Sequence, residues 1–247
     1  MKRIIFQATM LMAAFAVATA TTAAAQDLQK TYRISAGGQI RIGNISGDVV
    51  VNGYDGDAIM VKATKKGKDR DQVEIEDRSG GNTVDIGVRY PKHCNCDASI
   101  DFEVQVPRSI NYDFDRIASV SGDVTVTGVI GRLNASTVSG DARVNNVSGS
   151  VSASSVSGDV KVEINQLQGS DDMKFSTVSG DVSVMLPSSL DADVDMSSFS
   201  GSVKTDFGIE VKSERHGMHT SARGKLGDGS RRLKMSSVSG DLSLRHP

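Results

Sequence analysis

The chain has 247 residues, and 28 Lys and Arg nearly balance 30 Asp and Glu, which gives a formal net charge of −2. Without residues 1–25, which contain Lys2 and Arg3, 26 basic and 30 acidic residues remain, a net charge of −4. So weak a field excludes electrostatic recruitment to nucleic acid or to an anionic membrane surface. Hydrophobic residues make up 38% of the chain, enough to bury a core, but only 4% are aromatic and Trp is absent. Platforms for stacking sugars or bases are therefore scarce.

Residues 1–25 predict a secretory signal peptide. Lys2 and Arg3 form its basic start, residues 4–20 are uncharged and largely apolar, and Ala23–Ala25 supply small residues for cleavage before Gln26. The alternative is a retained membrane anchor, but the apolar stretch falls short of the roughly 20 residues that a span needs. We therefore expect a mature chain without an integral membrane segment, exported to the bacterial periplasm or the cell surface.

A repeated unit organises the rest of the chain. Its pattern is an apolar residue, Ser, Gly, Asp or Ser, and then apolar residues two apart, and it begins at Ile45, Val120, Val138, Val147, Val156, Val178, Phe199 and Val238. Between Val120 and Val156 the period is nine residues, with a degenerate unit at Val129. Such internal repetition is the signature of a stacked architecture.

Each unit predicts a short strand and a tight corner. Val124 and Val126, two residues apart, would point into a core, and Thr125 between them would face water. The Ser-Gly-Asp triplet is turn chemistry, in which Ser and Asp would bond the backbone of their own turn. We expect an all-β fold in which two units form one 18-residue rung of a β-solenoid. The alternative is a twisted β-sandwich.

The first half predicts strands without the repeat, at residues 31–35, 39–42, 58–64, 73–77, 83–90, 100–106 and 112–117. Residues 65–72 are charged and predict a solvated loop. A soft boundary near residue 110 separates an N-terminal β region, 26–110, from the repeat region, 111–247, and we expect one continuous domain. A basic stretch between Phe207 and Met235 predicts a solvated insertion loop, or alternatively a patch for an anionic polymer.

Cys94 and Cys96 are the only cysteines. In an exported protein such a pair is expected to be oxidised, so we predict a local disulfide. The alternatives are a redox site, or a soft-metal site with His93 as third ligand.

The repeated units resemble those of the exported bacterial putative-adhesin family that carries the DUF4097 domain. The Val-Ser-Gly-Asp-Val units carry the resemblance, together with the ending 227–244, where a Gly-rich corner precedes a last strand and a last Ser-Gly-Asp unit. It extends from about Gln39 to Leu244. The resemblance implies an all-β, solenoid-like envelope protein and brings no catalytic residues.

Few patterns suggest chemistry. The sequence has no nucleophile elbow, Walker loop, HExxH or EF-hand pattern, so we expect no catalytic residues, cofactor or metal. His216 and His219 flank Met218 and could offer ligands to copper. The repeated corner aspartates, Asp48, Asp123, Asp141, Asp159, Asp181 and Asp241, would stack about 4.8 Å apart and could attract Ca²⁺, although capping of their turns is the simpler role.

The sequence is compatible with three functions of different classes. The first, which we favour, is a non-enzymatic envelope protein, an adhesin or a binding scaffold for an unknown envelope or surface ligand. The second is a polysaccharide-acting β-helix enzyme, which would need acids and bases clustered beside a groove. The third is a metal or redox sensor built on His93, Cys94 and Cys96.

Overall fold

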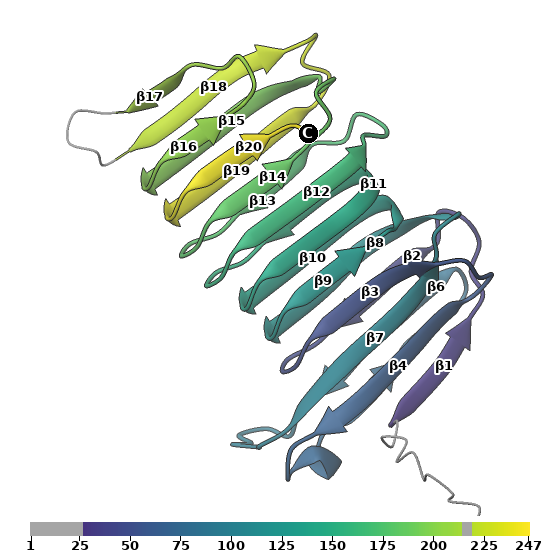
Figure 1. The fold of residues 1–247 in the computed structure, drawn as a ribbon. Helices are drawn as coiled ribbons and strands as arrows, with labels where there is room; N and C mark the ends of the chain where they lie inside the picture. The colour runs from purple at the N-terminus through teal and green to yellow at the C-terminus, as the bar shows by residue number, and fades with distance from the viewer. Residues whose placement is uncertain (1–26, 214–218) are drawn as a thin grey trace, which may run out of the picture.

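Alternating Val, Ile and Leu residues form β-strands throughout the computed structural model, which describes residues 27–213 and 219–247. The predicted signal peptide lies outside these described residues. Two flat layers of strands face each other and form one long stack (Figure 1). We name the layers by their relation to the Ser-Gly corners: strands of the entry sheet lead into the corners, and strands of the exit sheet leave them.

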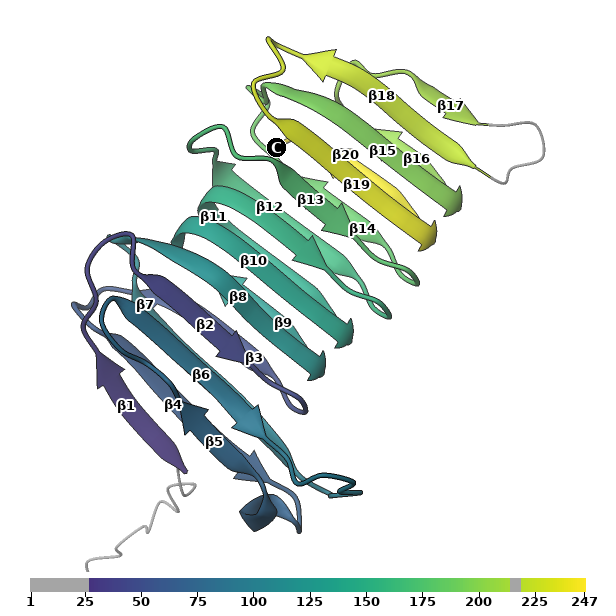
Figure 2. The same ribbon diagram turned by 180° about the vertical axis from the view of Figure 1, so that it is seen from behind.

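The entry sheet runs along one side of the stack (Figure 2). Its strands, in spatial order, are β5 (Glu74–Asp77), β6 (Thr83–Arg89), β2 (Gln39–Gly43), β8 (Asn111–Ser121), β10 (Ile130–Ser139), the second half of β11 (Ala142–Ser154), β13 (Met173–Ser176), β19 (Arg232–Ser239), β15 (Ala192–Ser200), β18 (Thr220–Leu226) and β17 (Val211–Ser213).

The exit sheet lies opposite. Its strands, in spatial order, are β1 (Leu28–Tyr32), β4 (Ile59–Lys66), β7 (Ser99–Pro107), β3 (Val49–Tyr54), β9 (Val124–Thr127), the first half of β11, β12 (Val160–Gln166), β14 (Val182–Met185), β20 (Leu242–Arg245) and β16 (Val203–Thr205). A single 3₁₀ turn, Arg70–Gln72, follows β4 in the described chain.

The middle of the stack is a parallel solenoid, which confirms the predicted fold class. Corners on neighbouring rungs are 18 residues apart from Asp123 to Asp141 and from Asp141 to Asp159, so two nine-residue units make one rung. The strands of successive rungs pair in parallel, whereas a sandwich of hairpins would pair them antiparallel. Antiparallel strands occur only towards the two ends of the described stack.

The rungs do not follow chain order. The rung of β2 and β3 lies between that of β6 and β7 and that of β8 and β9. The rung of β19 and β20 lies between that of β13 and β14 and that of β15 and β16. The last strands of the sequence therefore sit inside the stack rather than at its end (Figure 1).

Inward-facing aliphatic residues form one continuous core from Ile40 to Leu244. Val124 and Val126 are fully buried while Thr125 between them is partly exposed, as the alternation predicts. A few aromatic rings also lie in the core, and Tyr112 packs edge to face against Phe114 with centroids 6.3 Å apart. This core contains residues from both sides of residue 110.

A column of buried polar side chains supports the corners from inside. On six rungs the residue three before the corner glycine is Ser or Thr, and its hydroxyl donates to the glycine carbonyl of the neighbouring rung at 2.8–3.1 Å. The donors are Ser119, Thr137, Ser155, Thr177, Ser237 and Ser198. Asn44 plays the same part on the first repeat rung, where its side-chain amide reaches the Ile100 carbonyl at 2.7 Å.

We expect Thr177→Val to lower the free energy of unfolding by about 1–2 kcal/mol, because valine keeps the shape of the side chain but leaves the partly buried Gly158 carbonyl without its hydroxyl donor. Urea unfolding monitored by circular dichroism measures the loss. The control is Ser176→Ala on the neighbouring, partly exposed position. Equal effects of the two substitutions would contradict a structural role for the hydroxyl column.

In the seven units that form corners, the first apolar residue does not point into the core. Seven such residues stack at neighbouring corners and stay between 40% and 57% exposed, from Ile45 to Phe199. We call this row the apolar stripe; in spatial order it is Ile45, Val120, Val138, Val156, Val178, Val238 and Phe199. The valines that follow each corner fill the core as predicted, but the leading residue lies on the outer face.

Two expectations were wrong. The unit at Val147 does not form a corner, because β11 runs through it and bends near Asn146, whose φ is +53°. The basic stretch after Phe207 is not a long insertion loop. Its described residues form the antiparallel pair β17 and β18, which adds two strands to the entry sheet, and β19 begins at Arg232.

Candidate functional site

A hollow opens on the outer face of the entry sheet where two strands diverge. Asp159 and Asp181, the corner aspartates of two neighbouring rungs, are 22 residues apart instead of 18. The extra residues lie in the loop 167–172 between β12 and β13. As a result β11 pairs with β13 only at Ala153 and Ser154. Three adjoining hollows of about 230, 190 and 270 Å³ lie along β10, β11 and this loop, and we call them together the polar groove.

Short hydroxyl and amide side chains cover most of the groove. They come from outward positions of three strands, and the amine of Lys174 lies among them. The residues are Asn134 and Ser136 on β10, Ser150, Ser152 and Ser154 on β11, and Lys174 and Ser176 on β13. The described residues offer no hydrogen-bond partner to the hydroxyls of Ser136, Ser152 and Ser176.

The charged groups of the groove lie at its loop end. Arg132 pairs with Asp113 through two hydrogen bonds of 3.1 and 2.8 Å, and an Asp113 hydrogen bond and charge raise the pKa of this arginine. Asp171 accepts a hydrogen bond from Ser150 at 3.2 Å, and Asp172 accepts one from the Arg232 amide at 2.8 Å. The groove thus offers donors, acceptors, an amine and carboxylates to a ligand rich in hydroxyl and amide groups.

The corner aspartates form a ladder between rungs rather than caps within a turn, which corrects the expected local bonding. One carboxylate oxygen of each aspartate accepts the backbone N–H of the corner residue on the next rung at 2.7–3.0 Å. Burial alone would raise the pKa of Asp123, but the Asp141 amide and Arg143 outweigh it and lower the pKa. The Asp181 amide and Lys161 lower the pKa of Asp159 in the same way.

In this ladder, the carboxylates that would have to bind calcium already accept hydrogen bonds from the next rung. Arg143 also ion-pairs with both Asp123 and Asp141. Within residues 27–213 and 219–247, no group of three or more Asp, Glu, His or Cys side chains is arranged to hold a metal ion. The geometry accounts for these aspartates by hydrogen bonding between rungs.

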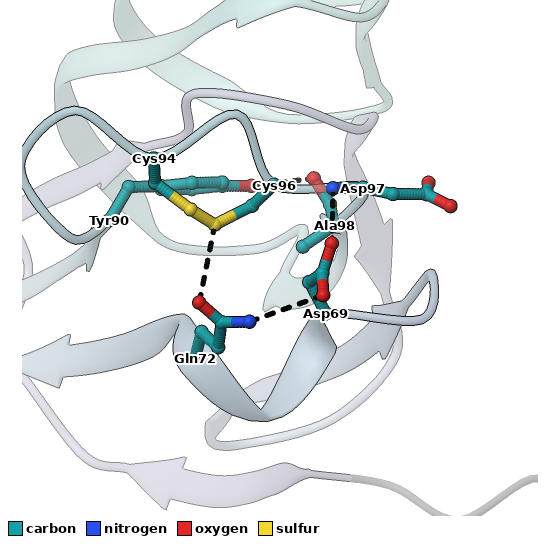
Figure 3. Close-up of a disulfide and its surroundings, with 7 residues drawn as sticks. All are labelled: Asp69, Gln72, Tyr90, Cys94, Cys96, Asp97 and Ala98. Atoms are coloured by element: carbon teal, nitrogen blue, oxygen red, sulfur yellow. Dashed lines mark hydrogen bonds between the residues drawn. A yellow bond between two sulfur atoms is a disulfide. The ribbon is translucent and has the colours of Figure 1, made fainter.

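Cys94 and Cys96 are joined by a disulfide in the loop between β6 and β7, with Cα atoms 5.1 Å apart (Figure 3). Cys96 Sγ lies 3.7 Å from Gln72 Oε1, and the Gln72 amide donates to Asp69 at 3.1 Å. Asp69 also accepts the Asp97 amide at 2.9 Å. These contacts hold the disulfide loop against the 3₁₀ turn, although the bonded residues are 24 and 28 positions apart in the sequence. Oxidation of this pair in the cell stays a prediction.

The histidine-based alternatives receive little support from the geometry. With Cys94 and Cys96 bonded to each other, His93 has no thiolate beside it to complete a soft-metal site. His216 and Met218 of the suggested copper motif lie outside the described residues, and His219 begins the segment that forms β18. Of the described basic residues nearby, Arg223 pairs with Asp195 at 3.0 Å and Lys212 with Glu210 at 3.8 Å.

Sequence reasoning missed the polar groove. Its serines and Asn134 belong to the repeats as ordinary outward positions, and nothing in their type marks a site. The available signal was spacing, because the units at Val156 and Val178 are 22 residues apart where the earlier rungs repeat every 18. Extra residues in one rung of a stacked fold must either bulge out as a loop or separate neighbouring strands. Here the loop 167–172 bulges out, and β11 and β13 separate except at Ala153 and Ser154.

Residues 109–245 match the family model described as Toastrack DUF4097. Because the match covers more than half of the chain, the protein belongs to the Toastrack DUF4097 family, and the resemblance found in the sequence is confirmed. A search of curated proteins gave no match. No helix among the described residues is long and apolar enough to cross a bilayer.

Three solved structures resemble the chain at low identity. A putative cell adhesion protein from Clostridium sporogenes is 11% identical, covering 89% of this chain and 99% of its own, with a TM-score of 0.47. A putative adhesin from Bacteroides fragilis is 12% identical, covering 88% and 96%, with a TM-score of 0.40. A putative lipid binding protein from Parabacteroides distasonis is 12% identical, covering 89% and 96%, with a TM-score of 0.28. Likeness at this level does not transfer a function.

Proposed function

We propose that the protein is a non-enzymatic binding scaffold of the bacterial cell envelope, exported by its N-terminal leader. The polar groove supports this proposal, because it presents unpartnered hydroxyl and amine groups on a rigid sheet face. A ligand rich in hydroxyl, amide and charged groups fits such a lining, and the glycan strands and peptide stems of peptidoglycan have this chemistry. Because the groove also contains the carboxylates of Asp171 and Asp172, which could serve as acid or base, the test of this proposal includes an assay for cleavage of the polymer.

Sedimentation with purified peptidoglycan tests the ligand. We expect the wild-type protein to pellet with the polymer and Ser152→Phe, which fills the groove, to stay in the supernatant. Ser183→Phe is the matched control, because Ser183 is an exposed serine on the outer face of the exit sheet. A wild-type protein that stays soluble, or a Ser152→Phe variant that pellets equally well, would overturn the assignment. Release of soluble fragments from the polymer would make the protein an enzyme instead.

Cell fractionation tests the location independently. If the protein is periplasmic, we expect to find it in the periplasmic fraction. If it lies at the cell surface, we expect protease added to intact cells to digest it. Retention of the full-length chain inside the cytoplasmic fraction would contradict export while leaving the groove's binding properties untouched.

A further inference from the structure

The apolar stripe is a second surface, separate from the polar groove. Its seven side chains stack in register, because the serine that follows each of them bridges to the equivalent serine of the next rung. Contiguous apolar rows of this kind on a protein surface mark interaction sites more often than single exposed residues do. At the strand spacing of about 4.8 Å, seven rungs give a row roughly 29 Å long.

Negative charge runs beside the stripe. Each corner turns from the apolar residue through Ser and Gly to the ladder aspartate three positions on, or to Ser202 on the rung of Phe199. Asp123 and Asp141 share an ion pair with Arg143, and Asp159 pairs with Lys161. Asp48, Asp181 and Asp241, by contrast, are exposed and have no ion-pair partner among the described residues. Hydrogen bonds from Ser202 and, to a smaller extent, the charge of nearby Lys204 lower the pKa of Asp241, so this carboxylate is charged at neutral pH.

The backbone of the corners limits what can bind there. Corner N–H groups already donate to carbonyls of neighbouring rungs, as Gly140 does to Ser157 at 3.1 Å and Gly158 to Ser179 at 3.0 Å. An added β-strand would therefore find no free edge along the stripe. A partner whose own backbone is satisfied internally, an α-helix, suits a row of side chains. A helix rises 1.5 Å per residue, so about 19 residues would cover the row.

We propose that the apolar stripe docks a basic amphipathic helix of a partner polypeptide. The aliphatic face of that helix would lie on the valines. Its Lys or Arg residues would face the carboxylates without ion pairs, Asp48 towards one end of the ladder and Asp181 and Asp241 towards the other. A second copy of the chain fits less well, because two stripes placed face to face would bring two acidic ladders together.

Fluorescence anisotropy with synthetic peptides tests the proposal. The probe is a labelled 20-residue helix with Leu at positions i, i+3, i+4 and i+7 and Lys on the remaining face. The comparison peptide carries Glu in place of every Lys. We expect the basic peptide to bind at least tenfold more tightly than the acidic one, and its affinity to fall as salt is raised.

Variants of the stripe and the ladder complete the test. The double substitution Val156→Ser/Val178→Ser removes two apolar side chains that are each 46% exposed, and we expect it to weaken binding of the basic peptide at least tenfold. Met185→Ser, an exposed apolar position on the exit sheet, is the matched control and should bind normally. Asp181→Asn/Asp241→Asn should weaken binding and flatten the salt dependence. Melting curves confirm that each variant is folded.

Several results would overturn the proposal. One is equal binding of the basic and acidic peptides, and another is unchanged binding by the folded Val156→Ser/Val178→Ser variant. Sedimentation equilibrium that finds a dimer lost in the same variant would assign the stripe to a second copy of the chain. Flotation with phosphatidylcholine vesicles that depends on Val156 and Val178 would assign it to a lipid surface.

Discussion

Gly158→Ala is expected to unfold the middle of the stack. Gly158 has a φ of +149°, and a Cβ added there would lie 2.1 Å from the Gly140 carbonyl oxygen of the preceding rung. The obstacle is backbone, so no side chain can move aside, and the backbone conformation itself disfavours alanine. We expect a loss of about 3 kcal/mol or more in the free energy of unfolding, measured by urea titration.

Gly80→Ala is the matched control for this substitution. Gly80 lies in the turn between β5 and β6, where an added Cβ would meet nothing within 4 Å. Its effect should stay within about 0.5 kcal/mol of wild type. If Gly158→Ala proved as mild as Gly80→Ala, the close stacking of corner glycines would be wrong.

Val182→Asp is expected to have the second large effect. Val182 is fully buried and lies in register between Val160 and Leu242 on neighbouring strands. A carboxylate there would have no partner in the core, which costs several kcal/mol. Because burial raises the pKa of such a group above the unfolded value of about 3.9, the penalty grows as the pH rises above that value. Thermal melts at several pH values measure it.

The adjacent position provides the comparison. Ser183→Asp adds the same carboxylate on the exposed face of β14, opposite Lys161, and should change stability by less than about 0.5 kcal/mol. Should Val182→Asp yield no folded protein, Val182→Ala should still cost about 2 kcal/mol by leaving a cavity. Equal stability of the Val182 and Ser183 variants would show that the two faces of this strand are assigned wrongly.

The rung could be predicted from sequence because its cause is local. The nine-residue period fixes the corner spacing, and alternation places Val160 and Val162 in the core and Lys161 outside. The same alternation accounts for the leading residue of the corner-forming units. Val156 follows the buried Ser155, so period-two alternation turns it outward although it is apolar.

The order of the rungs could not be predicted, because every Ser-Gly-Asp corner offers the same pairing surface to every other one. Asp48 could stack on Asp123 or on another corner with the same bonds, and longer connections leave the choice to tertiary packing. The polar groove depends in turn on this choice and on the extra residues of the loop 167–172. The aspartate ladder was missed for a related reason, since a turn seen alone suggests bonds within itself.

The placement of β19 and β20 has a consequence for how the molecule is made. β19 and β20 follow all these strands in the sequence and separate β13 and β14 from β15 and β16, so the earlier strands cannot find their lasting neighbours until β20 has been synthesised. Completion of the stack is thus a checkpoint on chain integrity. A chain that ended before β19 would leave β13, β14, β15 and β16 without their β19 and β20 partners. Proteases and aggregation act first on such exposed strand edges.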